Sequence, residues 1–138
     1  RFWCIFSFLS VFLYLNLISI FLEYFSSKHK LGILGGGQLG KMLLYNTSKF
    51  DIHTCVLYPN KDAPSRLSCN SFCQGDLMDF KSVYEFGKNL DTLTIEIENV
   101  NVEALKALEK NGVKVYPVSN LVSKVAQLIV LNHLCLFQ

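Results

Sequence analysis

Glycine residues at the spacing of a phosphate-binding loop are the strongest chemical signal in this 138-residue chain. Gly35, Gly37 and Gly40 fit the G-x-G-x-x-G pattern, between the apolar run at residues 31–34 and the start of helical periodicity. Such a loop needs glycine where the backbone has a positive φ or approaches a phosphate closely, and the helix start adds unpaired N–H groups. The order strand, turn, helix favours an anion site, although the same spacing also occurs in glycine-rich turns that bind no ligand.

A second candidate lies where a later apolar stretch carries acidic residues. Residues 93–97 (LTIEI) predict a strand, and period-two alternation would place Thr94, Glu96 and Glu98 on one face. Ligands of parallel sheets bind at the carboxyl ends of the strands, so Glu96 is a candidate ligand-binding carboxylate. The alternative is a structural role, in which Glu96 caps a neighbouring helix or pairs with a lysine.

The composition gives little support for other chemistry. The net charge is +2 and the basic residues are scattered, which disfavours a nucleic-acid-binding surface. The five cysteines lack the paired spacing of a disulfide framework or a zinc site, and the three histidines have no acidic residue at a catalytic spacing. We therefore expect neither a metal site nor a catalytic residue in this chain, and we expect Cys69 and Cys73 to be reduced and partly buried.

The elements that must position these residues alternate between strand and helix. Strands are predicted at residues 31–34, 52–58, 71–74, 93–97 and 113–116, and helices at residues 38–49, 79–88 and 102–110. This alternation predicts an α/β fold, a Rossmann-like parallel sheet with helices on both faces. The last helix should bury Ala104, Leu105 and Leu108 on one face and should end at Gly112.

The first 27 residues differ from the rest, because residues 2–22 carry no charge and are long enough to span a bilayer. A membrane anchor, a targeting segment and sequence foreign to the following domain all fit that composition. The chain begins with Arg1 instead of Met, so we expect a fragment. We divide it into an apolar, helical segment (1–27) outside the folded domain, a domain (28–127) and a divergent tail (128–138).

Several motifs together resemble the amino-terminal pre-ATP-grasp domain of 5-(carboxyamino)imidazole ribonucleotide synthases, which are ATP-grasp ligases of purine synthesis. In chain order they are LGILGGGQLGKML, a strand ending in Tyr58-Pro59, DAPSR, GDL, DTLTIEIENVNVEAL and GVKVYP. The resemblance covers residues 30–127. The combination of GGGQLG with TIEIENV is far more specific than the glycine spacing alone.

The resemblance implies that the complete protein carboxylates 5-aminoimidazole ribonucleotide with bicarbonate and ATP, and that this domain holds the ribonucleotide. The implied substrate-binding residues are Gly36, Gly37, Gln38, Leu39 and Glu96. ATP and Mg²⁺ would bind outside this fragment, which should be inactive alone. The resemblance further implies a cytoplasmic protein without nucleic-acid or membrane partners, and it leaves a homodimer of the complete enzyme open.

Three features depart from the family pattern. Tyr58 stands where many relatives have Asp, Lys41 replaces the more usual Arg and so loses its planar fork, and the pattern fails after Gln127. Two alternatives come from other classes of protein. A dinucleotide-binding oxidoreductase domain would need an acidic residue near Tyr58 to hold a ribose, and a membrane-tethered binding module would depend on the apolar segment.

Overall fold

Five parallel strands form one sheet in the order β3-β2-β1-β4-β5. The computed structural model describes residues 28–122 and 124, so the predictions for residues 1–27 and 128–138 lie outside the described residues. The strands are β1 (Lys30–Leu34), β2 (His53–Tyr58), β3 (Ser71–Gln74), β4 (Thr92–Ile95) and β5 (Lys114–Tyr116). The helices are α2 (Gln38–Thr47), α3 (Phe80–Gly87) and α4 (Val102–Lys110), and a 3₁₀ helix, η1 (Ser48–Phe50), follows α2. The predicted elements agree with these bounds to within about two residues.

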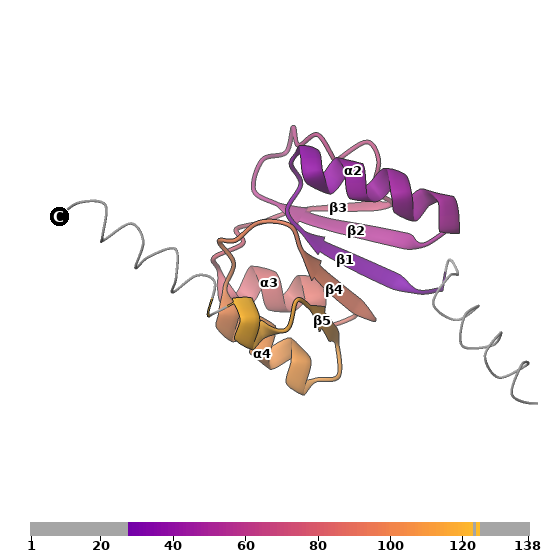
Figure 1. Ribbon diagram of the computed structural model, residues 1–138. Helices are drawn as coiled ribbons and strands as arrows, with labels where there is room; N and C mark the ends of the chain where they lie inside the picture. Colours follow the sequence, from indigo (N-terminus) through magenta and orange to yellow (C-terminus); the bar gives the residue numbers. More distant parts are fainter. Residues whose placement is uncertain (1–27, 123, 125–138) are drawn as a thin grey trace, which may run out of the picture.

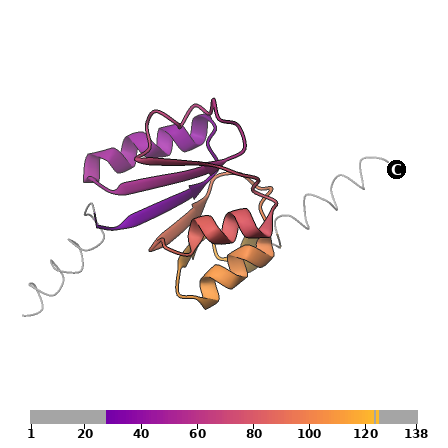
Figure 2. The same ribbon diagram turned by 180° about the vertical axis from the view of Figure 1, so that it is seen from behind.

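The sheet lies between two helical layers, as predicted. Helix α2 covers one face, and α3 and α4 cover the other (Figures 1 and 2). Neighbouring residues of β1 point to opposite layers: Ile33 packs with Leu44 of α2, whereas Leu34 belongs to the core cluster that contains Leu105 of α4. All three leucines and Ile33 are almost completely buried. Because both faces are covered, β1 reads as a continuous apolar run instead of an alternating one.

Helix α4 shows how its sequence sets both its packing and its end. Ala104, Leu105 and Leu108 are fully buried, which confirms the predicted apolar face. Gly112 follows the helix with a φ of 89°, and the N–H of Val113 donates to the carbonyl of Leu108 at 3.1 Å. This is the Schellman arrangement, in which a glycine adopts the left-handed conformation that other residues avoid.

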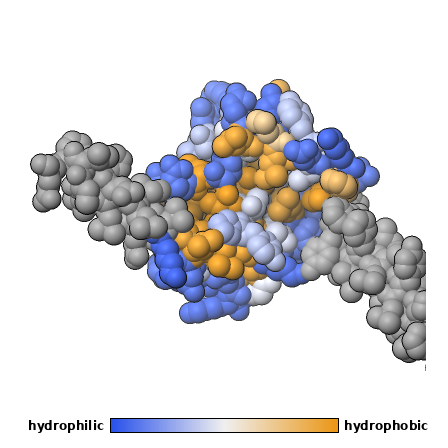
Figure 3. All heavy atoms as spheres, in the orientation of Figure 1, coloured by the Kyte–Doolittle hydropathy of each residue, from blue (hydrophilic) through white to orange (hydrophobic). Residues whose placement is uncertain are grey.

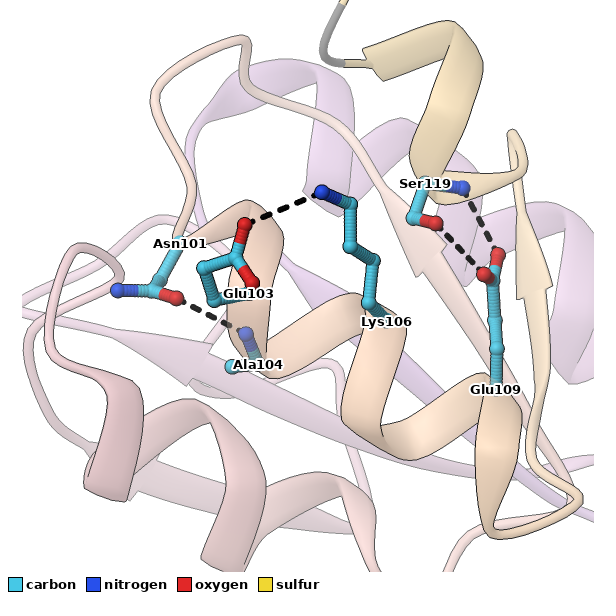
Figure 4. A network of polar contacts seen from close by, with 6 residues as sticks. All are labelled: Asn101, Glu103, Ala104, Lys106, Glu109 and Ser119. Carbon is cyan, nitrogen blue, oxygen red and sulfur yellow. Dashed lines mark hydrogen bonds and ion pairs between the residues drawn. The ribbon is translucent and has the colours of Figure 1, made fainter.

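Two of the helices begin with a side-chain cap. The Asp79 carboxylate accepts hydrogen bonds from the N–H and the hydroxyl of Ser82, both at 2.7 Å, at the start of α3. The Asn101 side chain accepts from the N–H of Ala104 at 2.9 Å at the start of α4 (Figure 4). The hydrogen bonds from Ser82, first that of its hydroxyl and then that of its N–H, hold the pKa of Asp79 below its usual value.

The two caps should respond differently to acid. Because the pKa of Asp79 is lower in the folded state, its contribution to stability is present above its unfolded pKa and is lost as the pH falls through the folded pKa. Asp79→Ala should therefore lower the urea midpoint more near neutral pH than in acid, where the protonated side chain keeps only a neutral cap. Asn101→Ala should cost about 1 kcal/mol at both pH values, since an amide does not titrate. Urea unfolding of both variants tests this, and an undiminished loss for Asp79→Ala in acid would contradict it.

Strand β4 ends earlier than the sequence predicts. Its last residue, Ile95, lies opposite Leu34, the last residue of β1, because the chain turns away at Gly35. On the other side, β5 stops before Pro117, which has no N–H to donate to a neighbour. The strand therefore ends two residues before the predicted end, although the N–H of Glu96 still donates to the Leu34 carbonyl at 2.9 Å. Ile95 and Ile97 both pack against the same core cluster, whereas the Glu96 carboxylate lies toward the glycine loop, as the alternation predicts.

In the described part of the chain, no helix combines the length and the apolar character needed to cross a membrane. The predicted apolar segment itself falls on residues that the structure does not describe.

Candidate functional site

The glycine loop and Glu96 meet at the carboxyl ends of the two central strands. The arrows of β1 and β4 point to the same side of the molecule, where α2 begins (Figure 1). The chain passes from β1 to β2 on one side, whereas β4 pairs with the other side of β1. Ligands of open α/β sheets bind at such a switch point, where successive connections diverge. The strand order thus brings both sequence candidates to one place.

The Glu96 carboxylate lies directly against the loop. Gly35 has a φ of 126°, and a Cβ added to it would overlap the Glu96 carboxylate and lie 2.7 Å from Cγ2 of Ile97. A Cβ on Gly37 would lie 3.8 Å from Oε1 of Glu96. Only glycine can occupy position 35 in this conformation, so the loop and the carboxylate can be this close because the sequence has no side chain there.

The N-terminus of α2 has the features of an anion site. Gly37 is its N-cap residue, and the helix has no side-chain cap and no acidic residue in its first turn. Gly37 accepts the first helical hydrogen bond, from the N–H of Lys41 at 3.0 Å. Gln38 and Leu39 are exposed at this end, with Leu39 64% accessible. The first N–H groups and the positive end of the helix dipole therefore have no cap or acidic residue within the helix itself.

Gly36 packs against Tyr58 at the end of β2 and against Ser65 in the connection to β3. It is buried, and a Cβ added to it would lie 2.8 Å from both Oγ of Ser65 and Cβ of Tyr58. The N–H of Ser65 donates to the Gly36 carbonyl at 3.2 Å. A side chain at Gly36 would thus point into the protein, and the predicted contact of Gly36 with the substrate stays a prediction. The sequence alone did not identify Ser65 as a residue of the site, although it lies in the DAPSR motif.

The structural alternative for Glu96 finds no support among the described residues. Its side chain is partly buried, and no hydrogen bond or ion pair to its carboxylate is present within residues 28–122 and 124. Glu96 caps none of the three α-helices in the described residues, because α2 has no side-chain cap and α3 and α4 are capped by Asp79 and Asn101. A partly buried carboxylate without a partner is available to accept hydrogen bonds from a ligand.

An apolar groove of about 230 Å³ adjoins Glu96. It is lined by Ile95, Glu96, Ile97, Glu98, Pro117, Leu121 and Val122. Figure 3 shows hydrophobic residues gathered across the middle of the molecule, between α2 at the top and α4 at the bottom. The carboxylate thus stands between a polar loop on one side and an apolar surface on the other, which suits a ligand with both an anionic and a planar apolar part.

The described residues contain no cluster of metal ligands, and two of their thiols have a raised pKa. No three His, Cys, Asp or Glu side chains in the described ranges lie close enough to share a metal ion. Cys55, Cys69 and Cys73 are free thiols, of which Cys73 is exposed and not partly buried as predicted. Burial raises the pKa of the Cys55 and Cys69 thiols, so both stay protonated and weakly nucleophilic at neutral pH.

The fold and the site define a doubly wound α/β domain with an uncapped glycine loop and a carboxylate at its switch point. More particularly, the chain belongs to the family of ribonucleotide synthetase pre-ATP-grasp domains, whose model matches residues 28–127. This confirms the resemblance seen in the sequence motifs.

The relatives are ribonucleotide synthases. The N5-carboxyaminoimidazole ribonucleotide synthase of Staphylococcus epidermidis is 40% identical over 80 residues, which cover 58% of this chain and 21% of the relative. The crystal structure of the Thermotoga maritima synthetase has a TM-score of 0.66 and 29% identity, over 69% of this chain and 26% of that one. An Aspergillus clavatus synthase in complex with ADP and 5-aminoimidazole ribonucleotide has a TM-score of 0.63 and 30% identity, over 69% and 25% of the two chains.

The chain spans about a fifth of the length of the curated relatives it matches, 21% for the Staphylococcus epidermidis enzyme. These relatives support the ribonucleotide synthase prediction and do not support the oxidoreductase alternative.

Proposed function

We propose that this chain is the ribonucleotide-binding part of an ATP-dependent ligase that carboxylates 5-aminoimidazole ribonucleotide in purine synthesis. The observation that carries the proposal is the contact between the uncapped start of α2 and the partnerless Glu96 carboxylate, at the switch point of a domain of this family. The Aspergillus clavatus relative, which contains this ribonucleotide together with ADP, supports the choice of substrate.

The charges of the site suggest how a ribonucleotide would lie. Its phosphate would accept hydrogen bonds from the N–H groups of Gly37, Gln38 and Leu39 at the positive end of α2. A carboxylate repels a phosphate, so Glu96 would face the ribose hydroxyls or the exocyclic amine and accept hydrogen bonds from them. The apolar groove beside Glu96 would then take the edge of the imidazole ring.

The role of these residues is to bind and to orient. ATP and its Mg²⁺, bound outside this fragment, would supply the activation of bicarbonate. Glu96 would hold the ribonucleotide with its amine directed toward the rest of the enzyme, and Gly36 would keep the loop in place. This chain would be inactive alone. A cytoplasmic location, a possible homodimer and the lack of nucleic-acid or membrane partners stay predictions from the family resemblance.

Titration of the 138-residue chain with ligands tests the proposal. In NMR spectra, 5-aminoimidazole ribonucleotide should shift the amide signals of residues 35–40 and 96–98, because the glycine loop and Glu96 are adjacent. Calorimetry with Mg-ATP should show no micromolar binding, since the proposed nucleotide site lies elsewhere. Micromolar binding of Mg-ATP would contradict the proposal. Shifts at residues 35–40 with NADH but not with the ribonucleotide would favour the dinucleotide-binding alternative.

A further inference from the structure

Ser65, in the connection between β2 and β3, carries a buried hydroxyl without a hydrogen-bond partner. The residue is completely inaccessible to solvent, and within the described ranges its Oγ has no hydrogen-bond partner. Three other buried polar side chains are satisfied. Thr47 donates to the Leu44 carbonyl at 3.0 Å, Thr54 to the Asn70 side chain at 3.0 Å and Ser119 to the Glu109 carboxylate at 2.6 Å. An unsatisfied hydroxyl in the interior raises the free energy of the state that contains it, and it needs an explanation.

The hydroxyl points at the glycine loop. Its Oγ lies 2.8 Å from the position that a Cβ on Gly36 would occupy. The Cβ positions of Gly35 and Gly37 lie toward Glu96 instead, so the hydroxyl and the carboxylate are found on different sides of the loop. Together with the uncapped N-terminus of α2, the Ser65 hydroxyl is a second, independent polar feature of the same site.

The planar peptide between Gly36 and Gly37 connects Ser65 with the N–H group at the start of α2. The N–H of Ser65 already donates to the Gly36 carbonyl at 3.2 Å. That carbonyl and the N–H of Gly37 belong to the same trans peptide unit and point in opposite directions. When Ser65 holds the carbonyl, it therefore directs the Gly37 N–H away from itself, toward the open edge where α2 begins.

An anion bound to the Gly37 N–H would strengthen the interaction between Ser65 and the Gly36 carbonyl. A hydrogen bond from the Gly37 N–H to an anion polarises the peptide and makes the Gly36 carbonyl a better acceptor. The carbonyl has a second lone pair, which the Ser65 hydroxyl could use. The hydroxyl makes no such bond in this structure, and a bond formed when the ligand binds would favour the liganded state.

We propose that Ser65 is a positioning residue of the ribonucleotide site, whose hydroxyl bonds to the Gly36 carbonyl when a phosphate group binds to the Gly37 N–H. The inference rests on the proposed function and adds to it the residue that couples the loop to the phosphate. Ser65 does not touch the ligand. It acts through the Gly36–Gly37 peptide.

The variants Ser65→Ala and Ser119→Ala separate this role from a structural one. Ser65→Ala removes a hydroxyl with no bond to lose, so the thermal midpoint of the ligand-free chain should stay the same or rise. Its affinity for 5-aminoimidazole ribonucleotide should fall about three- to tenfold, the value of one hydrogen bond. Ser119→Ala removes a hydrogen bond to the Glu109 carboxylate (Figure 4). Both residues are distant in sequence from the glycine loop. The Ser119→Ala variant should melt at a lower temperature and bind the ribonucleotide as the wild type does.

Two further measurements test whether the effect of Ser65 depends on the phosphate group. The corresponding ribonucleoside, which has no phosphate, should bind equally to the wild type and to Ser65→Ala. In the wild type, the ribonucleotide should shift the Gly37 amide signal and slow the exchange of the Ser65 hydroxyl proton, a readout that needs no variant. A wild-type chain that fails to bind the ribonucleotide overturns the proposed function together with this inference. Normal binding that is unaffected by Ser65→Ala, or a loss of affinity that only follows a loss of stability, overturns the inference alone.

Discussion

Gly35→Ala should destabilise the chain by about 2–6 kcal/mol and abolish ribonucleotide binding. Two costs combine at this position. The φ of 126° strains any residue that has a Cβ, by about 1–3 kcal/mol. The new Cβ would also lie 2.7 Å from Cγ2 of Ile97 and overlap the Glu96 carboxylate, and such overpacking costs about 1–3 kcal/mol more. Urea unfolding measures the total.

Gly112→Ala is the matched control, because it introduces backbone strain at a positive φ without a steric clash of the new Cβ. Gly112 has a φ of 89°, and no atom lies within 4 Å of its Cβ position. Its cost should therefore be the backbone term alone, about 1–3 kcal/mol, with ribonucleotide binding intact. Equal losses in the two variants would mean that the side chains of Glu96 and Ile97 move aside without cost, and that the loop is not packed tightly against the carboxylate.

The glycine loop was predictable because its determinants are local. A positive φ at the end of a strand requires glycine, and the helical periodicity after Gly37 marks the start of α2 in the sequence itself. The buried faces of β1 and α4 could also be read from the spacing of their apolar residues. For these elements the chain carries its own signals, and the structure agrees with them to within one or two residues.

The end of β4 and the role of Ser65 could not be predicted from local sequence. The strand ends at Ile95 because β1 and β5 end beside it, and strand ends of neighbours depend on the order in the sheet. Ser65 reaches Gly36 through a connection that has no helical or strand periodicity. Whether its hydroxyl has a partner depends on atoms that are distant in the sequence. Contacts such as these cannot be predicted from residue spacing, because the order of the strands in the sheet decides which residues meet.

The same topology explains why a short domain can build a site from residues that are far apart. Gly35 and Glu96 belong to different strand ends, and the pairing of Leu34 with Ile95 brings those ends together. Because the core packs against both faces of β1 and against one face of β4, the loops at their carboxyl ends start from fixed positions. The site therefore depends on the stability of the sheet, and variants must be compared for folding before they are compared for binding.

Glu96→Gln should weaken the binding of 5-aminoimidazole ribonucleotide about ten- to a hundredfold, because a hydrogen bond to a charged acceptor contributes about 1.5–3 kcal/mol. The carboxylate has no hydrogen-bond or ion-pair partner within the described residues, so the substitution should not lower the unfolding midpoint of the ligand-free chain. In the complete enzyme it should raise the KM for the ribonucleotide more than the KM for ATP. Gln38→Ala should act in the same direction.

Glu98→Gln is the control for this substitution, because it removes the same charge two residues later in the chain. Glu98 is exposed, whereas Glu96 is partly buried against the glycine loop. Glu98 also lines the apolar groove, but its exposed carboxylate is solvated, so Glu98→Gln should change the affinity less than Glu96→Gln does. Binding measured by NMR titration for both variants distinguishes the two effects. Equal losses would show that the affinity does not depend on the particular position of Glu96 beside the loop, and unchanged binding in both variants would remove Glu96 from the site.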